Sequence, residues 1–345
     1  MSGFTGGDIL SCYHPWYFVP DLRYPKVVPE TGEVKFKYRP LEKYNPKSDN
    51  FGLRDDGIKV PCGKCLGCKL DYSRSWADRM ILELQSNDGK GIFVTLTYNN
   101  DHVPFTFDED FPDVPNGFSL CKRDLQLFFK RLRKRFPDKT IRYYACGEYG
   151  HQTQRPHYHC IIFGLSLDDF PDRRIVGCNE LGQDYFTSDN FQRVWSDQDG
   201  FPIGFVCLSD VSYKTCAYVS RYCAKKIFHG ESTINGTSEF TLMSRRPGLG
   251  SWYFDDHPDV IEKKHIYLSD SSGSVKVSVP KYYLQKLKLT NRKLYDKLIF
   301  ERKQFALDRD LLKLQGTSLS YIDQLELEEE ALFKKTQILF NRKEV

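Results

Sequence analysis

The stretch of sequence that decides the fold is residues 141–164, IRYYACGEYGHQTQRPHYHCIIFG. Its two ends, 141–149 and 157–164, are rich in β-branched, aromatic and aliphatic side chains, which is typical of β-strands. The polar segment between them contains Gly150 and Pro156, and this composition indicates a turn. The stretch therefore predicts an antiparallel β-hairpin.

The hairpin gives a spatial meaning to His157 and His159. Side chains alternate across a strand, so the two imidazoles share a face and can offer nitrogen ligands to one divalent cation. Glu148 lies on the partner strand, and we expect its carboxylate on the same face. This ligand set would leave coordination positions for water and a phosphate oxygen. His151 in the turn is an alternative ligand, and without a metal the pattern is two surface histidines beside an exposed acid.

A second chemical element lies in residues 218–226, YVSRYCAKK. On a helix, residues four apart share a face, so Tyr218 and Tyr222 would present both phenols in one direction. Lys225 would stand on a neighbouring ridge. The structural alternative is an ordinary pair of tyrosines on an amphipathic helix.

Together these residue types indicate chemistry on a phosphodiester. A bound cation withdraws charge from a non-bridging oxygen, and a phenol with a pKa of about 10 becomes a nucleophile when a metal or a basic side chain favours its phenolate. Attack would leave a 5′-phosphotyrosine and a free 3′-hydroxyl, and this ester keeps the bond energy needed to rejoin strands. A second tyrosine one helical turn away would allow another cleavage before the first link is resolved.

The flanking sequence alternates between strand and helix patterns. Further elements are expected as strands at 91–98 and 203–208, and as helices at about 70–85, at 119–136 with Ser119 as N-cap, and from Ser209 or Asp210 to about Lys226. The remaining segments are residues 1–60, which indicate loops and short strands, 229–280, which are variable, and a helical tail from about Tyr282 that is interrupted near Gly316.

Charge is clustered rather than globally high. The chain has 345 residues and a net charge of +4, but 119–136 holds seven basic residues against one acid, and 281–303 holds eight against two. Such clusters fit a polyanion, although solvated helix faces are the alternative. The candidate DNA contacts are Lys122, Arg123, Lys130, Arg131, Arg133 and Lys134. No apolar run approaches the roughly 18 residues of a membrane span and no signal peptide is recognisable, so we expect a cytoplasmic protein without a membrane partner.

Three of the eleven cysteines have the spacing of a metal-binding turn. Cys62, Cys65 and Cys68 can supply three thiolates to a structural Zn²⁺, with Cys12 as the preferred fourth ligand and His14 as the next candidate. The spacing also matches part of an iron–sulfur run, but the fourth cysteine of that run is absent. Reduced thiols without a metal would fit the same spacing, as would a redox pair.

At these residues the chain resembles a known family. GEYG, RPHYH and YVSRYCAKK, with FVTLTY upstream, are similar to the three motifs of His-hydrophobe-His replication initiators. The two-tyrosine variant and the CGKCxxC element resemble the microvirus branch, especially that of gokushoviruses. The resemblance covers about Val60 to Lys226 and extends more weakly to SRRPGLG at 244–250.

The resemblance implies a fold, an activity and roles for residues. The fold would be α+β, with a central antiparallel sheet and flanking helices as in ferredoxin-like or RNA-recognition-motif-like domains. Phe93–Tyr98 would be a structural motif at its centre. His157, His159 and an acid that we place at Glu148 would hold Mg²⁺ or Mn²⁺. The paired nucleophiles would be Tyr218 and Tyr222, with Lys225 on the phosphate. The substrate would be single-stranded or hairpin origin DNA.

This interpretation divides the chain into three parts. They are a loop-rich segment with the cysteines at 1–85, an endonuclease domain at 86–235, and a variable region with a helical tail at 236–345. No P-loop motif occurs, so we expect a host helicase and polymerase as partners in the cytoplasm of a bacterial host. Three different functions stay open: a non-catalytic zinc protein that binds nucleic acid, a hydrolase that uses water, and a plasmid or transposon enzyme with the same chemistry.

Overall fold

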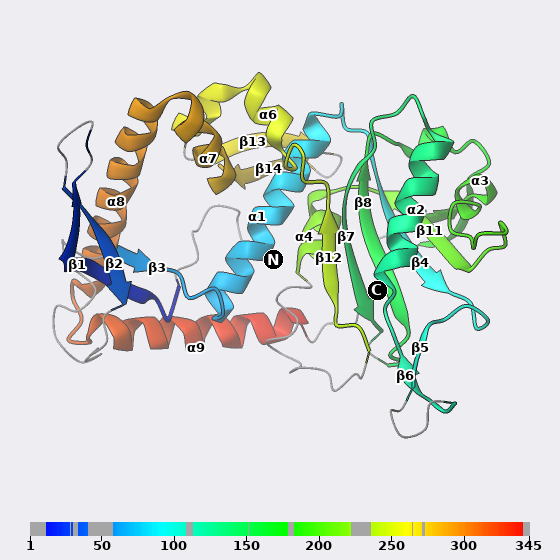
Figure 1. Cartoon of the computed structure of the whole chain (residues 1–345), viewed down its shortest axis with the longest axis horizontal. Coiled ribbons are helices and arrows are strands. Elements are labelled where there is room, and N and C mark those ends of the chain that lie inside the picture. Colours follow the sequence, from blue (N-terminus) through cyan, green and yellow to red (C-terminus); the bar gives the residue numbers. More distant parts are fainter. Residues whose placement is uncertain are drawn as a thin grey trace. The chain divides into compact units, whose positions relative to one another are not determined.

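The computed structural model describes residues 12–27, 29, 34–40, 58–107, 113–150, 152–178, 183–221, 236–263, 265–270 and 273–340 (Figure 1). These residues belong to two compact units. The first lies within Ser73–Tyr283, and the second lies within Asp8–Tyr72 and Leu284–Lys343. No helix among the described residues combines the length and the apolar character needed to cross a membrane.

An antiparallel seven-stranded sheet forms the centre of the first unit, in the order β12-β7-β8-β4-β11-β10-β9. In chain order its strands are β4 (Gly91–Tyr98), β7 (Arg142–Tyr149), β8 (Pro156–Phe163), β9 (Arg174–Cys178), β10 (Asp184–Thr187), β11 (Gly204–Asp210) and β12 (Phe240–Met243). Two further pairs are β5 (Phe105–Phe107) with β6 (Pro115–Phe118), and β13 (His265–Asp270) with β14 (Gly273–Ser278).

Helices lie on both faces of this sheet. They are α1 (Leu66–Gln85), α2 (Lys122–Arg135), α3 (Asp189–Gln192), α4 (Tyr213–Ser220), α6 (Ser251–Asp256) and α7 (Lys281–Thr290), with short 3-10 turns at Leu167–Asp169 and Pro258–Glu262. The boundaries between the two units fall inside α1 and α7.

One face of the sheet packs against α2 and α3. Alternation along β4 and β8 directs Leu96 and Tyr158 to this face, where they join one core cluster with Phe128 of α2 and Phe191 of α3. Trp195 closes this layer, since its indole N–H donates to the Thr97 carbonyl at 2.8 Å. The central strands are therefore covered here by an apolar layer that excludes water.

The opposite face carries His157 and His159 and packs against α1 and α4. Trp76 of α1 lies 5.3 Å from Tyr144 of β7, measured between ring centroids. Tyr218 of α4 contacts the ring of His159 on the same face. The candidate metal ligands thus lie on a sheet face that helices partly cover.

A three-stranded sheet and long helices make up the second unit. The sheet has the order β2-β1-β3, formed by β1 (Trp16–Val27), β2 (Val34–Pro40) and β3 (Ile58–Val60). The helices are the first residues of α1, the end of α7, α8 (Arg292–Leu314) and α9 (Tyr321–Phe340). Lys313 of α8 pairs with Glu328 of α9 at 2.6 Å, and Tyr321 donates to Asp310 at 3.2 Å, so the two helices are joined by buried and half-buried polar contacts.

The expected α+β fold with a central antiparallel sheet is confirmed, as is the hairpin of 141–164. The interruption near Gly316 also occurs, because that glycine adopts φ +83° between α8 and α9.

Two predicted helix starts are wrong. The helix after β11 begins at Tyr213 rather than at Ser209 or Asp210, because β11 continues to Asp210, which pairs with Ile92. Ser212 is its N-cap and accepts from the Thr215 N–H. Likewise Ser119 does not cap α2, whose N-cap is Cys121, because the Ser119 hydroxyl is engaged with Thr237.

Two segments contain more regular structure than expected. Residues 1–60 include β1, a strand of 12 residues, which the composition did not reveal. The variable stretch 229–280 includes β12, which extends the main sheet beyond β7 by pairing Phe240 with Gly147. In both cases pairing with a distant strand, rather than local composition, determines the structure.

Candidate metal and nucleophile site

The β7–β8 hairpin brings the three candidate metal ligands together. Glu148 is the register partner of His157, and Cys146 is the partner of His159. One carboxylate oxygen, Glu148 Oε1, lies 2.7 Å from His157 Nε2 and 2.8 Å from His159 Nε2. One ligand atom from each of the three residues falls within 4.8 Å of the others. The predicted hairpin register, with all three side chains on one face, is confirmed.

Neighbouring polar groups orient both imidazoles. His157 Nδ1 lies 3.1 Å from the Arg155 carbonyl oxygen, and His159 Nδ1 lies 3.0 Å from the Thr95 hydroxyl. A hydrogen bond at Nδ1 fixes the ring and directs the Nε2 lone pair to the other side. Both Nε2 atoms therefore face the point where the carboxylate lies.

Burial and charge act in opposite directions on Glu148. The side chain is 2% exposed. Burial alone would raise the pKa of Glu148, but the hydrogen bonds and the charges of His157 and His159 outweigh burial and hold the pKa at about 2. An ionised carboxylate between two imidazole nitrogens is a donor set suited to a divalent cation such as Mg²⁺ or Mn²⁺.

Tyr218 lies next to these ligands. Its ring centroid is 5.3 Å from that of His159, edge to face, and 6.4 Å from that of Phe93 on β4. The Phe93 ring also stacks on His159 at 5.6 Å. A hydrophobic wall thus surrounds one histidine and holds the Tyr218 side chain against it.

Helix α4, which carries Tyr218, is fixed to α1 by two polar contacts. The buried hydroxyls of Ser220 and Ser73 lie 3.1 Å apart. Tyr213 donates to Asp78 at 3.0 Å, and the Ser278 N–H donates to the other oxygen of that carboxylate at 3.1 Å. These contacts position the helix on the sheet face that carries the histidines.

Residues 244–250, SRRPGLG, close one end of the same face. Arg142 of β7 forms a buried ion pair with Glu83 of α1 and donates to the Pro247 carbonyl at 2.9 Å. The second Glu83 oxygen accepts the Gly250 N–H at 2.7 Å, and Gly250 has a φ of +75°, which favours glycine. The segment is therefore a structural clamp between α1 and β7.

The cysteine cluster is a separate group of candidate ligands in the second unit. The Sγ atoms of Cys12, Cys62, Cys65 and Cys68 all lie within 4.8 Å of one another. His14, the second candidate for the fourth position, lies 2.5 Å from Glu329 instead. The fourth thiol thus comes from a position 50 residues before Cys62 in the chain.

Backbone N–H groups point at these sulfurs. Lys64 and Cys65 donate to the Sγ of Cys62 at 3.4 and 3.3 Å, and Cys68 donates to the Sγ of Cys65 at 3.5 Å. The Cys62 N–H donates to the Sγ of Cys12 at 3.2 Å. Such donors stabilise the negative charge of thiolates, which are the form that binds a metal.

Comparison with known proteins places these sites in a family. Residues 91–227 match the family of the replication-associated protein ORF2. The chain is 32% identical to "Replication-associated protein ORF2" of Spiroplasma virus 4 over 280 residues, which cover 79% of this chain and 82% of that protein. It belongs to this family of replication-associated proteins.

Two other relatives come from phages of different hosts. "Replication-associated protein VP4" of Bdellovibrio phage phiMH2K is 29% identical over 65% of either chain. "Replication-associated protein ORF4" of Chlamydia phage 1 is 27% identical over 73% of this chain and 57% of that protein. No solved structure matches. The resemblance to microvirus replication initiators is thereby confirmed, and a role in phage DNA replication follows.

The matched region of the replication-associated protein contains every predicted ligand and nucleophile of the sheet face. Of these, Tyr222, Lys225 and the alternative ligand His151 lie outside the described residues. Thr95 and Phe93 were not foreseen as neighbours of His159, because their proximity depends on the pairing of β4 with β8. Alternation of Phe93 and Thr95 along one strand was the available signal, but it does not name a partner.

The candidate DNA-binding residues lie on α2, on the sheet face opposite the histidines. Two of the six make contacts within the protein: Arg133 donates to the Ile141 carbonyl at 3.2 Å, and the Lys122 ammonium lies 4.9 Å from the centre of the Phe240 ring. Arg123 and Lys130 are exposed, and Arg131 and Lys134 border a hollow.

Proposed function

We propose that this replication-associated protein is a metal-dependent DNA nickase of the His-hydrophobe-His type that initiates rolling-circle replication with a tyrosine nucleophile. The supporting observation is the position of the Tyr218 ring against His159, which itself converges with His157 and Glu148. A metal-ligand set beside a phenol is the arrangement that cleavage through a covalent phosphotyrosine requires.

Glu148, His157 and His159 would hold Mg²⁺ or Mn²⁺. The donor set fits such an ion, because it combines two oriented imidazole nitrogens with an ionised, buried carboxylate. When bound, the cation withdraws charge from a non-bridging phosphate oxygen and stabilises the transition state. The chain itself contributes a dry wall, formed by Phe93, that keeps water from one side of His159.

Tyr218 would carry out the first cleavage. Its phenolate oxygen attacks the phosphorus, a phosphorus–oxygen bond to the tyrosine forms, and the bond from phosphorus to the 3′ oxygen breaks. The phenol proton is lost to solvent and the leaving oxygen takes up a proton, so no oxidant or reductant is needed. Rejoining is the reverse of this step with a new 3′-hydroxyl.

Tyr222 and Lys225 enter this proposal from the sequence, as a second nucleophile and as a contact to the phosphate. A second phenol would let one strand be cut while the first phosphotyrosine is still intact, which repeated cut-and-join cycles need. The substrate is single-stranded origin DNA, and the site of action is the cytoplasm of the bacterial host.

The test is incubation with single-stranded origin DNA and Mn²⁺, followed by denaturing electrophoresis. A band of protein joined to DNA is expected for the wild type and for Tyr267→Phe, an exposed tyrosine that serves as a control. The double variant Tyr218→Phe, Tyr222→Phe should give no joined band. His157→Ala should reduce cleavage at least about 100-fold while weak DNA binding persists.

Two outcomes would contradict the proposal. Cleavage without a protein–DNA link would identify water as the nucleophile. Specific DNA binding in the wild type without any cleavage would identify a non-catalytic zinc-containing binding protein. His102→Ala, which removes a histidine hydrogen-bonded to Asn99 outside the ligand set, should cleave at the wild-type rate.

The cysteine cluster would hold a structural Zn²⁺. Four thiols, each pair within 4.8 Å, are a closed tetrahedral donor set, and the backbone donors to sulfur fit thiolates. An iron–sulfur run would require a cysteine at a sequence position where this chain has none. The cluster therefore serves the fold of the second unit in this proposal and takes no part in cleavage.

Unwinding of the duplex would come from a host helicase, and synthesis from a host polymerase. The sequence holds no P-loop that could couple ATP hydrolysis to strand separation. The purified protein should therefore extend a nick only when a helicase and a polymerase are added. ATP-driven unwinding by the purified protein alone, measured by release of a labelled strand, would contradict this part of the proposal.

A further inference from the structure

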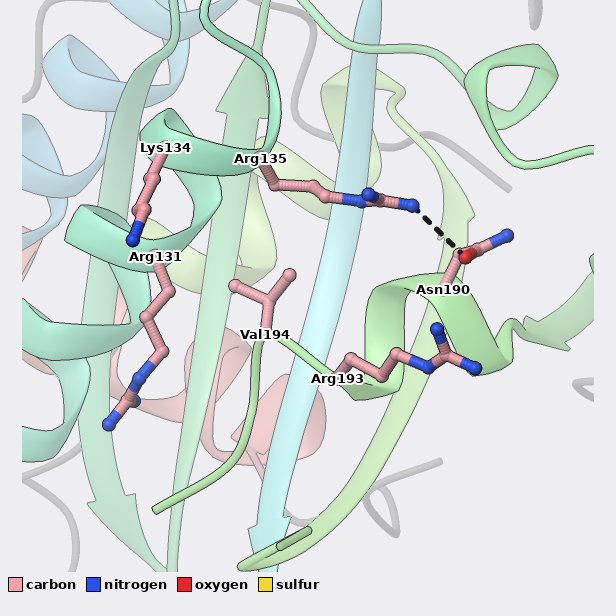
Figure 2. A pocket seen from close by; sticks show the side chains of 6 residues that line it. All are labelled: Arg131, Lys134, Arg135, Asn190, Arg193 and Val194. Carbon is pink, nitrogen blue, oxygen red and sulfur yellow. Dashed lines mark hydrogen bonds between the residues drawn. The ribbon is translucent and has the colours of Figure 1, made fainter. Parts of the chain in front are cut away.

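A basic hollow lies between α2 and α3 (Figure 2). Its volume is about 430 Å³, and four of its six lining side chains are cations. The lining residues are Arg131, Lys134 and Arg135 of α2, and Asn190, Arg193 and Val194 of α3 and the residues that follow it. No acid and no aromatic ring is among them.

The hollow and the candidate cleavage site lie on opposite faces of the sheet. Helices α2 and α3 pack on the face that carries Tyr158, as the contact of 5.8 Å between the rings of Phe128 and Phe191 indicates. His157 and His159 flank Tyr158 in β8 and point to the other face. A phosphate in the hollow is therefore a different phosphate from the one that is cut.

The cations of the hollow are held apart from counter-charges. Figure 2 shows Arg135 reaching across to Asn190, whose side-chain oxygen accepts its N–H at 3.2 Å. Within the part of the chain that the structure describes, Arg131, Lys134 and Arg193 form no ion pair. The neighbouring acid Asp189 is instead paired with Arg174 at 2.9 Å.

Unpaired cations of this density repel one another unless a polyanion neutralises them. Three of the four are arginines, whose planar guanidinium groups match phosphate oxygens in a forked geometry. Single-stranded nucleic acid sites combine basic groups with aromatic rings on which bases stack, and the lining of this hollow has none. Backbone contact to a duplex needs only the cations.

We propose that the α2–α3 hollow binds the phosphate backbone of double-stranded DNA beside the origin. The inference rests on the proposed function in that DNA is the substrate. The hollow would hold the duplex on one face of the sheet while the exposed strand reaches the histidines on the other. Its contacts would fix the position of the DNA without reading base sequence.

The test measures the salt dependence of binding to a duplex of about 20 base pairs by fluorescence anisotropy. Removal of one cation that contacts a phosphate lowers the slope of log Kd against log salt by about 0.9, so Arg131→Ala with Arg193→Ala should lower it by about two. The control, Lys276→Ala with Lys281→Ala, removes the same charge elsewhere in the first unit and should leave the slope at the wild-type value. Arg131→Lys with Arg193→Lys keeps the charges and should keep most of the slope.

The outcomes separate this inference from the proposed function. Equal decreases of slope in the alanine variant and in the control would overturn the hollow, since global charge would then explain binding. A slope unchanged in the alanine variant would overturn it as well, even where the wild type forms a covalent band with single-stranded DNA. If the wild type forms no such band but the alanine variant has a lower slope, nickase chemistry fails and the hollow stands.

Discussion

The two candidate metal clusters of this protein differ in every property that decides what a metal could do. On the sheet face, two imidazoles and one carboxylate surround a point next to the Tyr218 ring, and His157 remains 19% exposed. In the second unit, four thiols face one another and receive backbone N–H groups. The first arrangement leaves room for a substrate oxygen, whereas the second is filled by the protein.

This difference teaches that ligand chemistry and surroundings separate a reactive site from a structural one. Nitrogen and oxygen ligands bind Mg²⁺ or Mn²⁺ with exchangeable positions, whereas four thiolates hold Zn²⁺ in a closed tetrahedron. The replication-associated protein would then use one metal for cleavage and another for folding. Variants of each cluster should therefore fail in opposite ways.

The largest expected effect is the loss of zinc and of folding in Cys65→Ser. Structural zinc contributes on the order of 10 kcal/mol to small domains, so removal of one thiolate should destabilise the second unit severely. Zinc per chain, measured by plasma mass spectrometry, should fall from about one to near zero, and an early unfolding transition should be seen by calorimetry.

The control is Cys178→Ser, because Cys178 is exposed on β9 and lies outside the cluster. It should keep both zinc and the wild-type unfolding curve. The comparison between the clusters breaks if Cys65→Ser keeps a full complement of zinc, or if it loses covalent cleavage while its unfolding curve is unchanged.

A smaller effect is expected from Thr95→Val, which removes the hydroxyl beside His159 Nδ1. Loss of such an orienting hydrogen bond costs about 10- to 100-fold in metal affinity or activity. The apparent Mn²⁺ affinity, taken from the dependence of cleavage rate on Mn²⁺ concentration, should weaken by this factor. Saturating Mn²⁺ should recover part of the rate, which a general folding defect would not allow.

Thr97→Val is a matched control on the same strand and face. The Thr97 hydroxyl lies 3.5 Å from the Phe205 carbonyl and contacts neither histidine. Its Mn²⁺ dependence should equal that of the wild type. Equal weakening in both variants would mean that a methyl group on β4, rather than the Thr95 hydroxyl, disturbs the site.

The sequence predicted the parts of this comparison that depend on local order. Alternation placed His157 and His159 on one face, and the short turn fixed Glu148 opposite them, because a hairpin register follows from loop length. The spacing of Cys62, Cys65 and Cys68 likewise predicted a cluster, because three ligands in seven residues can meet without long-range folding.

The parts that depend on distant pairing were less accessible. Cys12 could be named only as a candidate, since the chain between it and Cys62 is long. Thr95 became a neighbour of His159 through the β4–β8 register, and Ser73 became a neighbour of Ser220 through helix packing. Neither relation leaves a periodic trace in the sequence, so both required the tertiary structure.

The smallest expected effect concerns Asp78, through which pH could act on the Tyr218 helix without touching either cluster. Burial raises the pKa of Asp78 to about 6, although hydrogen bonds from Ser278 and Tyr213 and the charge of Arg74 oppose this shift. Because the folded pKa lies above the unfolded value, the folded state holds the proton more tightly. The associated stability is present below the unfolded pKa and is lost as pH rises through about 6.

Asp78→Asn removes this titration while keeping a side chain of the same shape. Between about pH 5 and about pH 7.5, the wild type should lose about 1 kcal/mol of unfolding free energy that the variant retains. Urea unfolding followed by tryptophan fluorescence at the two pH values measures the difference, and Asp138→Asn, an exposed aspartate after α2, should behave as the wild type. A variant whose stability changes with pH in parallel with the wild type would show that Asp78 does not titrate in this range. Zinc content and Mn²⁺ dependence should stay constant in Asp78→Asn, because the carboxylate supports the helix that presents the nucleophile and ligates neither metal.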